Sequence, residues 1–261
     1  MTHYTSDQYD NQFITREDWT ISPKQSAFFS VLYDGYQNPA FFNPHNILVT
    51  GPAGVIQTAE SFTLDDTYTF STHFVNAVHI TVHRRTDNRG YNSSDINATT
   101  LGVNVYQYVP VGLQVMEGKW TVGGGTNSLA HFNDNTLILN DDATLVIGKN
   151  QLMFGGVWIS NQFNSGNVYE GNGVFNFNGE FSGSGPQGGK VIGDQNLDFL
   201  AGAMNIFQQS MEQGFALRGP FPGLYIQDVY TASPRLTLTG GLRWTPNIMP
   251  YDAKNRGLGN L

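Results

Sequence analysis

The segment from Gly223 to Trp244 reads GLYIQDVYTASPRLTLTGGLRW. Its second half, from Leu236 onward, alternates apolar residues with Thr, Gly and Arg, which is the period of two expected of a β-strand with two different faces. Ser233-Pro234-Arg235 separates the two halves and has the composition of a tight turn. The segment therefore predicts a hairpin of two long strands.

The same period of two runs through most of the chain. It is cleanest in 169–181, where three phenylalanines share one face and polar residues occupy the other. The apolar set is Phe175, Phe177 and Phe181, and the polar set includes Asn172, Asn176, Asn178 and Glu180. We expect about ten antiparallel strands in an all-β meander, near 9–20, 25–36, 57–70, 75–86, 132–147, 151–163, 169–181, 203–213, 222–232 and 235–245. One short helix is expected near 196–202.

The connections between these strands fall into two kinds. Short turns join strand pairs at 22–24, 71–73, 148–150 and 233–235, whereas long polar or Gly/Pro-rich connections lie near 37–56, 86–131, 183–194 and 246–261. One end of the sheet therefore carries tight turns and the other carries long loops. This asymmetry is typical of outer-membrane barrels, and the strands have the length needed to cross a bilayer at a tilt.

The composition excludes several classes of protein. The chain has 261 residues, 13% of them charged, a net charge of −8 and no Cys. A disulfide scaffold and a Cys-ligated metal site are therefore excluded, and an acidic chain is a poor binder of nucleic acid. No run of 18 apolar residues predicts a transmembrane helix. The first residues have neither a basic region nor an apolar core, so we expect no signal peptide in this chain.

The hairpin at 223–244 resembles a pattern of TonB-dependent outer-membrane transporters, Y-x-Q-D-x-W-x-x-x-P-x-L-T-L-x-x-G-L-R-Y/W. The matching residues are Tyr225, Gln227, Asp228, Pro234, Leu236, Thr237, Leu238, Gly241, Leu242, Arg243 and Trp244. Tyr230 departs from the pattern, which more often has Trp there.

Three upstream segments resemble the same family in the same order. Residues 66–71 are similar to its D-T-Y-x-F-S hairpin, 155–158 to the strand after its F-G-G turn, and 198–202 to its D-F-L-L-G segment. Together they resemble the Oar-like branch, whose other members carry a carboxypeptidase-regulatory-like domain. The resemblance implies that 1–261 is part of a transporter β-barrel of about 22 strands, without the plug, signal peptide and TonB box of the family.

The resemblance also implies a function, namely import of a bulky, scarce solute across the bacterial outer membrane. The implied partners are outer-membrane lipid, the plug domain and remaining strands of a parent chain, and the TonB complex through that chain. The ligand, whether a small solute, an oligosaccharide or a peptide, stays open. No cofactor is implied, and no catalytic motif in the sequence favours an enzyme.

The expected faces give candidate site residues. Candidates for the polar face that lines the lumen are His79, His83, Asn176, Asn178, Glu180 and Arg243. Two histidines four residues apart in a strand are separated by about 13 Å, too far for one metal ion, so no metal site is expected. The apolar sets Phe175/Phe177/Phe181 and Leu236/Leu238/Leu242 are expected to contact lipid. The candidates for an interfacial aromatic girdle are Trp19, Tyr68, Trp158, Tyr230 and Trp244.

Two other interpretations stay open at this point. The chain could be a complete small outer-membrane barrel that acts as a passive pore, with its strands closing on themselves. Alternatively, it could be a soluble β-sandwich that binds polysaccharide, with the Phe-rich faces as the core between two sheets. Strand length and the sorting of turns from loops argue against the sandwich.

Overall fold

A computed structural model describes residues 7–46, 53–123, 129–183 and 193–254. Within these residues, nine strands form one sheet in the order β1-β2-β3-β4-β7-β8-β11-β12, with β13 paired to β11. Their bounds are β1 (Tyr9–Ser22), β2 (Gln25–Asn38), β3 (Gly54–Ser71), β4 (Phe74–Gly90), β7 (Ala130–Ile147), β8 (Asn150–Asn167), β11 (Gln213–Ser233), β12 (Leu236–Trp244) and β13 (Tyr251–Asp252). The predicted antiparallel meander of long strands is therefore confirmed.

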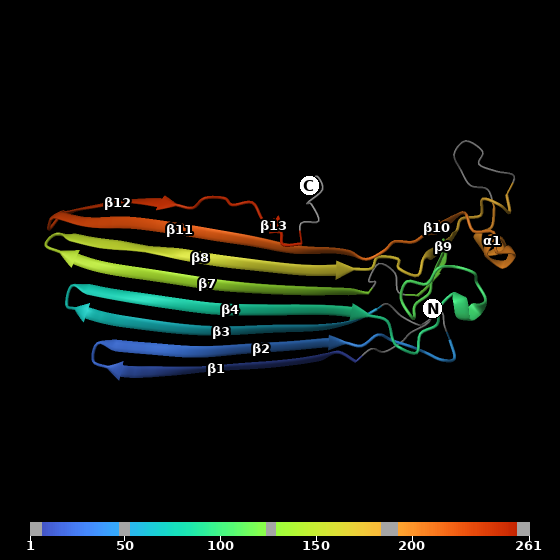
Figure 1. Cartoon of the computed structure of the whole chain (residues 1–261), viewed down its shortest axis with the longest axis horizontal. Helices are drawn as coiled ribbons and strands as arrows, with labels where there is room; N and C mark the ends of the chain where they lie inside the picture. The colour runs from blue at the N-terminus through green and yellow to red at the C-terminus, as the bar shows by residue number, and fades with distance from the viewer. Residues whose placement is uncertain (1–6, 47–52, 124–128, 184–192, 255–261) are drawn as a thin grey trace.

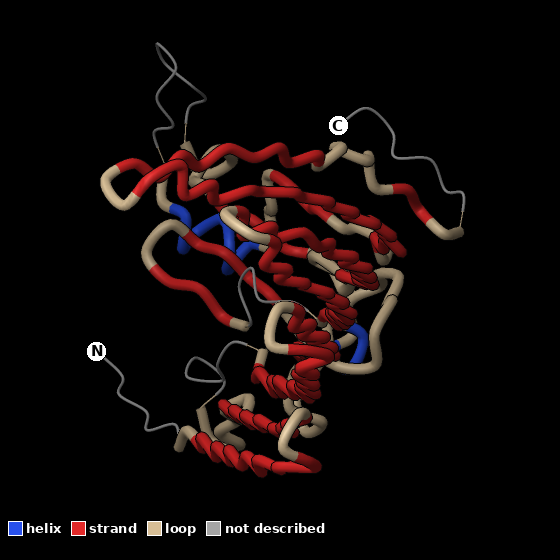
Figure 2. The backbone as a smooth tube through the Cα atoms, turned by 90° about the vertical axis from the view of Figure 1, so that its left-hand side faces the viewer, coloured by secondary structure: helices blue, strands red, loops and turns tan. Residues whose placement is uncertain are grey.

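The sheet has tight hairpin turns at one end only, as the sequence predicts. Two-residue turns join β1 to β2, β3 to β4, β7 to β8 and β11 to β12. All four lie on the left in Figure 1, and the long connections lie at the opposite end. Figure 2 looks at the sheet from that turn end and shows it bending into an open arc. In the described residues β1 and β12 do not pair with each other, so the sheet is not closed.

The strand pairing gives the sheet two chemically different faces. In β3, Phe62 and Leu64 lie on one face and Thr63 and Asp65 on the other, since successive side chains alternate. Following the register across the sheet extends each set to every long strand. The apolar face includes Phe29, Tyr33, Phe62, Leu64, Ile80, Leu139, Trp158, Leu224, Leu238 and Leu242, and the polar face includes Thr63, Asp65, His79, Thr81, Asn140, Asp142, Gln227, Thr239 and Arg243.

A second, smaller sheet lies beyond the long strands at the loop end (Figure 1). Its order is β10-β9-β5-β6, from β5 (Gln114–Glu117), β6 (Trp120–Val122), β9 (Val174–Phe177) and β10 (Ile206–Gln208). The 3-10 helix η2 (Thr99–Leu101) lies in the connection that leads to β5. Among the described residues, no strand of this sheet packs on a strand of the long sheet. The two sheets therefore do not form the sandwich considered above.

The small sheet corrects two of the predicted strands. The segments 169–181 and 203–213 do not add long strands to the main sheet, because only β9 and β10 form within them and they pair with each other. Phe175 and Phe177 belong to the buried apolar cluster of the small sheet and not to the apolar face of the long sheet. Phe181 is exposed and lies in the turn after β9.

The predicted helix is present as α1 (Gln195–Ala201). Asp194 caps its N-terminus by accepting a hydrogen bond from the Asn196 amide. Asp198, which is buried, accepts hydrogen bonds from the amides of Phe181 and Ser182 and so ties α1 to the turn after β9. Burial is the largest single influence on the pKa of Asp198 and raises it, but the hydrogen bonds together lower it below the ordinary 3.8. No helix of the described chain has the length and apolar character to span a membrane.

Candidate functional site

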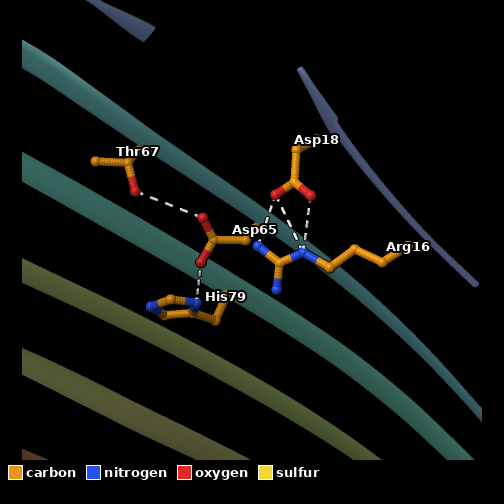
Figure 3. A network of polar contacts seen from close by, with 5 residues as sticks. All are labelled: Arg16, Asp18, Asp65, Thr67 and His79. Carbon is orange, nitrogen blue, oxygen red and sulfur yellow. Dashed lines mark hydrogen bonds and ion pairs between the residues drawn. The ribbon is translucent and has the colours of Figure 1, made fainter. Parts of the chain in front are cut away.

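The polar face carries a close network of polar contacts on β3 and β4, shown in Figure 3. Asp65 lies directly opposite His79, and its carboxylate contacts the imidazole Nδ1. The Thr67 hydroxyl donates to the other carboxylate oxygen over 3.4 Å. Asp65 is only 7% exposed, and a carboxylate shielded from water needs such partners. The pair therefore fixes the register of β3 against β4 on this face.

A second pair lies nearby on β1 in the same view (Figure 3). The Arg16 guanidinium donates to both carboxylate oxygens of Asp18, with an Nη2–Oδ1 distance of 2.6 Å. Its Cζ also lies 3.8 Å from the centroid of the Phe28 ring on β2. Both charged side chains are exposed, so the ion pair itself contributes little stability. Its effect is to hold a charged pair over the ring of the neighbouring strand.

Farther across the polar face, a tyrosine reaches over a glycine. Tyr225 on β11 lies opposite Gly155 on β8, which in turn lies opposite Asp142 on β7. The phenol donates a hydrogen bond of 2.6 Å to Asp142 Oδ1. A Cβ at Gly155 would lie 2.7 Å from that Oδ1 and 3.0 Å from the tyrosine ring. The absence of a side chain at 155 therefore lets one hydrogen bond span three strands.

The apolar face carries aromatic residues at two levels along the strands. Trp19, Tyr68 and Tyr230 lie near the tight turns, and Trp158 and Trp244 lie nearer the middle. By register, all five lie on the apolar face, together with the aliphatic residues of that face. Amphipathic rings at fixed levels around an apolar belt suit the interface of a bilayer.

Three of the four hairpins share a local pattern that the sequence analysis missed. The pattern is an acidic residue, any residue, an aromatic residue, Thr, any residue and Ser, and it occurs at 17–22, 66–71 and 228–233. In each case the serine hydroxyl accepts a hydrogen bond from the amide two residues on, and the register shifts by one residue beside it. Aligning the sequence on its own turns would have found this repeat. Three of the four hairpin turns are therefore built from one repeated unit.

A family model described as outer membrane beta barrel domain matches residues 2–261. The chain belongs to this family. A search among curated protein sequences found no match.

The barrel domain also has a counterpart among solved structures. It is similar to the outer membrane transporter YddB from Escherichia coli, with a TM-score of 0.51 and 10% sequence identity. The match covers 90% of this chain and 27% of the YddB chain, so the barrel domain spans about a quarter of that transporter's length. At this identity the likeness shows the fold alone.

The barrel domain brings together only part of the predicted site. His79, His83 and Arg243 lie on the polar face of the long sheet, where the first contacts Asp65 and the last lies opposite Tyr225. The other three candidates do not lie on the long sheet. Asn176 is in β9, and Asn178 and Glu180 are in the turn that follows, where the Asn178 side chain accepts a hydrogen bond from the Glu180 amide.

The residues that carry the family resemblance pair with one another in the barrel domain. Tyr225 lies opposite Arg243, and Gln227 lies opposite Gly241, whose added Cβ would meet the Ile226 carbonyl at 2.9 Å. Leu242 and Trp244 lie on the apolar face, as does Asp228, five residues before the turn serine. Over the described residues, no three His, Asp or Glu side chains gather into a possible metal site.

Proposed function

We propose that this chain forms part of the wall of a TonB-dependent transporter that imports a bulky solute across the bacterial outer membrane. The observation that carries the proposal is the two-faced sheet. Its apolar face suits contact with lipid, and its polar face suits a water-filled lumen occupied by a plug. We propose no catalytic role for any of its residues.

The open edges of the sheet support a larger barrel. The outer edges of β1 and β12 offer unpaired N–H and C=O groups, because neither strand has a second neighbour among the described residues. Such groups are costly in a lipid environment, where water cannot satisfy them. Further strands of a longer polypeptide would pair with both edges and close the wall.

The loop end supports an orientation. Long connections and the small sheet lie at one end, and short repeated turns lie at the other. In outer-membrane barrels the short turns face the periplasm and the long loops face the outside. An incoming solute would therefore reach the small sheet before it reaches the lumen.

Dependence on TonB rests on the resemblance of the 223–244 hairpin. The test expresses the complete polypeptide that carries residues 1–261 in a Gram-negative host, and then probes the outer-membrane fraction with the immobilised periplasmic domain of TonB. We expect the polypeptide in the outer membrane and retained by TonB. Outer-membrane location without TonB retention would refute TonB dependence, and a water-soluble product would refute the barrel.

A further inference from the structure

An apolar cavity that opens to the surface is lined by residues of the small sheet, α1 and η2. The cavity has a volume of about 840 Å³. Val115 on β5 and both Phe175 and Phe177 on β9 line it. Leu200 on α1 lines one side, and Leu101 on η2 lines the cavity as well. The volume lies within the range of small-molecule sites.

The aromatic residues of the cavity are held by one another. The Phe199 ring meets Trp120 edge-on at 4.9 Å and Phe177 edge-on at 5.3 Å, measured between ring centroids. The Trp120 indole N–H donates to Asn196 Oδ1 over 3.2 Å. These contacts tie α1 to β6 and β9, so contacts within the chain hold the aromatic side of the cavity in place.

The chemistry of the lining selects a class of ligand. Among the residues that the structure describes, no charged side chain lines the cavity, and its polar side chains are the Asn196 amide and the Trp120 indole. A charged ligand would lose its hydration without a partner. Flat aromatic molecules instead gain edge and face contacts with the rings.

Two of the apolar residues that line the cavity are also exposed at the surface. Leu200 is 79% exposed and Leu101 is 59% exposed, although both line the cavity. Apolar side chains gathered at the mouth of a concave site are typical of ligand or partner surfaces. The elements β9 and α1, which carry residues of the cavity, lie beyond the ends of the long strands in Figure 1, away from the β1 and β12 edges where further strands would add.

We propose that this cavity binds a neutral aromatic small molecule, with its single polar group toward Asn196. The inference rests on the proposed function only in that the cavity would face the outside of the cell. Binding itself does not depend on TonB or on transport.

The test uses the complete polypeptide in lipid nanodiscs, labelled with 5-fluorotryptophan and titrated with 2-naphthol. The chain has four tryptophans, and the Trp120 resonance is assigned by its loss in Trp120→Phe. We expect a saturable shift of the Trp120 signal alone. Trp158 and Trp244 on the apolar face report partition of the probe into lipid.

Two matched variants decide whether the shift reports the cavity. Leu200→Asp removes a lining residue and is expected to weaken binding about tenfold. Leu197→Asp changes a residue of the same helix that is 56% exposed and does not line the cavity, and it should leave binding unchanged. Leu101→Asp repeats the test away from α1, in case the helix is disturbed.

Three results would overturn the inference. These are no saturable shift at Trp120, a parallel non-saturating shift of all the tryptophan signals, and equal weakening by Leu200→Asp and Leu197→Asp. Failure here leaves the membrane fractionation and TonB retention unaffected, so the two proposals fail separately.

Discussion

The substitution Gly155→Ala tests how the polar face is held together. An added methyl group would lie 2.2 Å from the backbone carbonyl oxygen of Asp141 and 2.7 Å from Asp142 Oδ1. The carbonyl belongs to β7 and cannot turn away, so β8 must shift from it, which costs about 1–3 kcal/mol as overpacking does. The methyl group also displaces the Tyr225 ring, and losing its hydrogen bond to Asp142 costs about 1–2 kcal/mol more for a partly exposed pair.

The expected sum is a loss of about 2–5 kcal/mol in the free energy of unfolding. The assay is urea unfolding of the complete polypeptide in lipid vesicles, followed by the fluorescence of Trp158 on the same strand. With a slope of about 2–3 kcal/mol per molar urea, the midpoint should fall by roughly 1–2 M. Tyr225→Phe removes only the hydrogen bond and should lower the midpoint by less than half as much.

Gly240→Ala is the matched control. A Cβ at Gly240 meets no atom within 4 Å, so this change should alter stability by less than about 1 kcal/mol. Equal urea midpoints for Gly155→Ala and Gly240→Ala would show that the close packing of β7, β8 and Tyr225 at Gly155 does not stabilise the sheet.

Three further predictions follow from the same structure. Leu242→Arg places a charge on the apolar face, midway between the levels of Tyr230 and Trp158, and should destabilise the barrel by about 2–4 kcal/mol in bilayers, whereas Gln227→Arg on the polar face should cost less than about 1 kcal/mol; equal costs in vesicle unfolding would contradict the face assignment. His79→Ala leaves the Asp65 carboxylate without its main partner and should cost about 1–3 kcal/mol, whereas Asp65→Asn with His79→Ala should recover part of that loss; a double variant no more stable than His79→Ala would argue against the pair. The pKa of Asp198 lies below 3.8 in the folded chain, so its stabilisation is present above pH 3.8 and is lost as pH falls through the lower folded value. Hydrogen exchange of the two amides that it holds should therefore accelerate below pH 3.8, relative to the intrinsic rate, in the wild type but not in Asp198→Asn.

The long hairpins were predictable because two signals agree in them. Strict alternation fixes a strand and its two faces, and a turn of two or three polar residues fixes its partner. The turns at 22–24, 71–73, 148–150 and 233–235 therefore gave four correct strand pairs. Helix α1 was predictable for a similar reason, because Asp194 supplies an N-cap directly before an apolar run.

The small sheet was not predictable from periodicity alone. Alternation in 169–181 indicates a strand, but it does not say which sheet the strand joins. The break signals were Gly173 and Gly179, which both adopt φ of 84° and bracket the four residues of β9. Left-handed backbone at both ends does not continue a long strand, so the glycines limit β9 to a short piece.

The start of β11 was misplaced because of two prolines. The sequence predicts a strand that starts at 222, whereas β11 begins at Gln213 and runs through Pro220 and Pro222. Proline cannot donate to a strand ladder and is tolerated where one side lacks a partner. Both prolines lie between Arg218, which pairs with β13, and Leu224, the first residue that pairs with β12. Among the described residues, this stretch of β11 therefore pairs with β8 alone.

We propose that the apolar face of the long sheet lies in lipid and that its polar face lies in water. Residues 1–261 contain no cysteine, so once any cysteine elsewhere in the complete polypeptide is replaced by serine, single cysteines along β3 at 58–69 can each carry a nitroxide label in that polypeptide, reconstituted in vesicles. We predict that labels at even positions such as 62 and 64 collide mainly with dissolved oxygen, whereas labels at odd positions such as 63 and 67 collide mainly with a water-soluble paramagnetic reagent. A profile without alternation, or alternation in the opposite phase, would contradict the account.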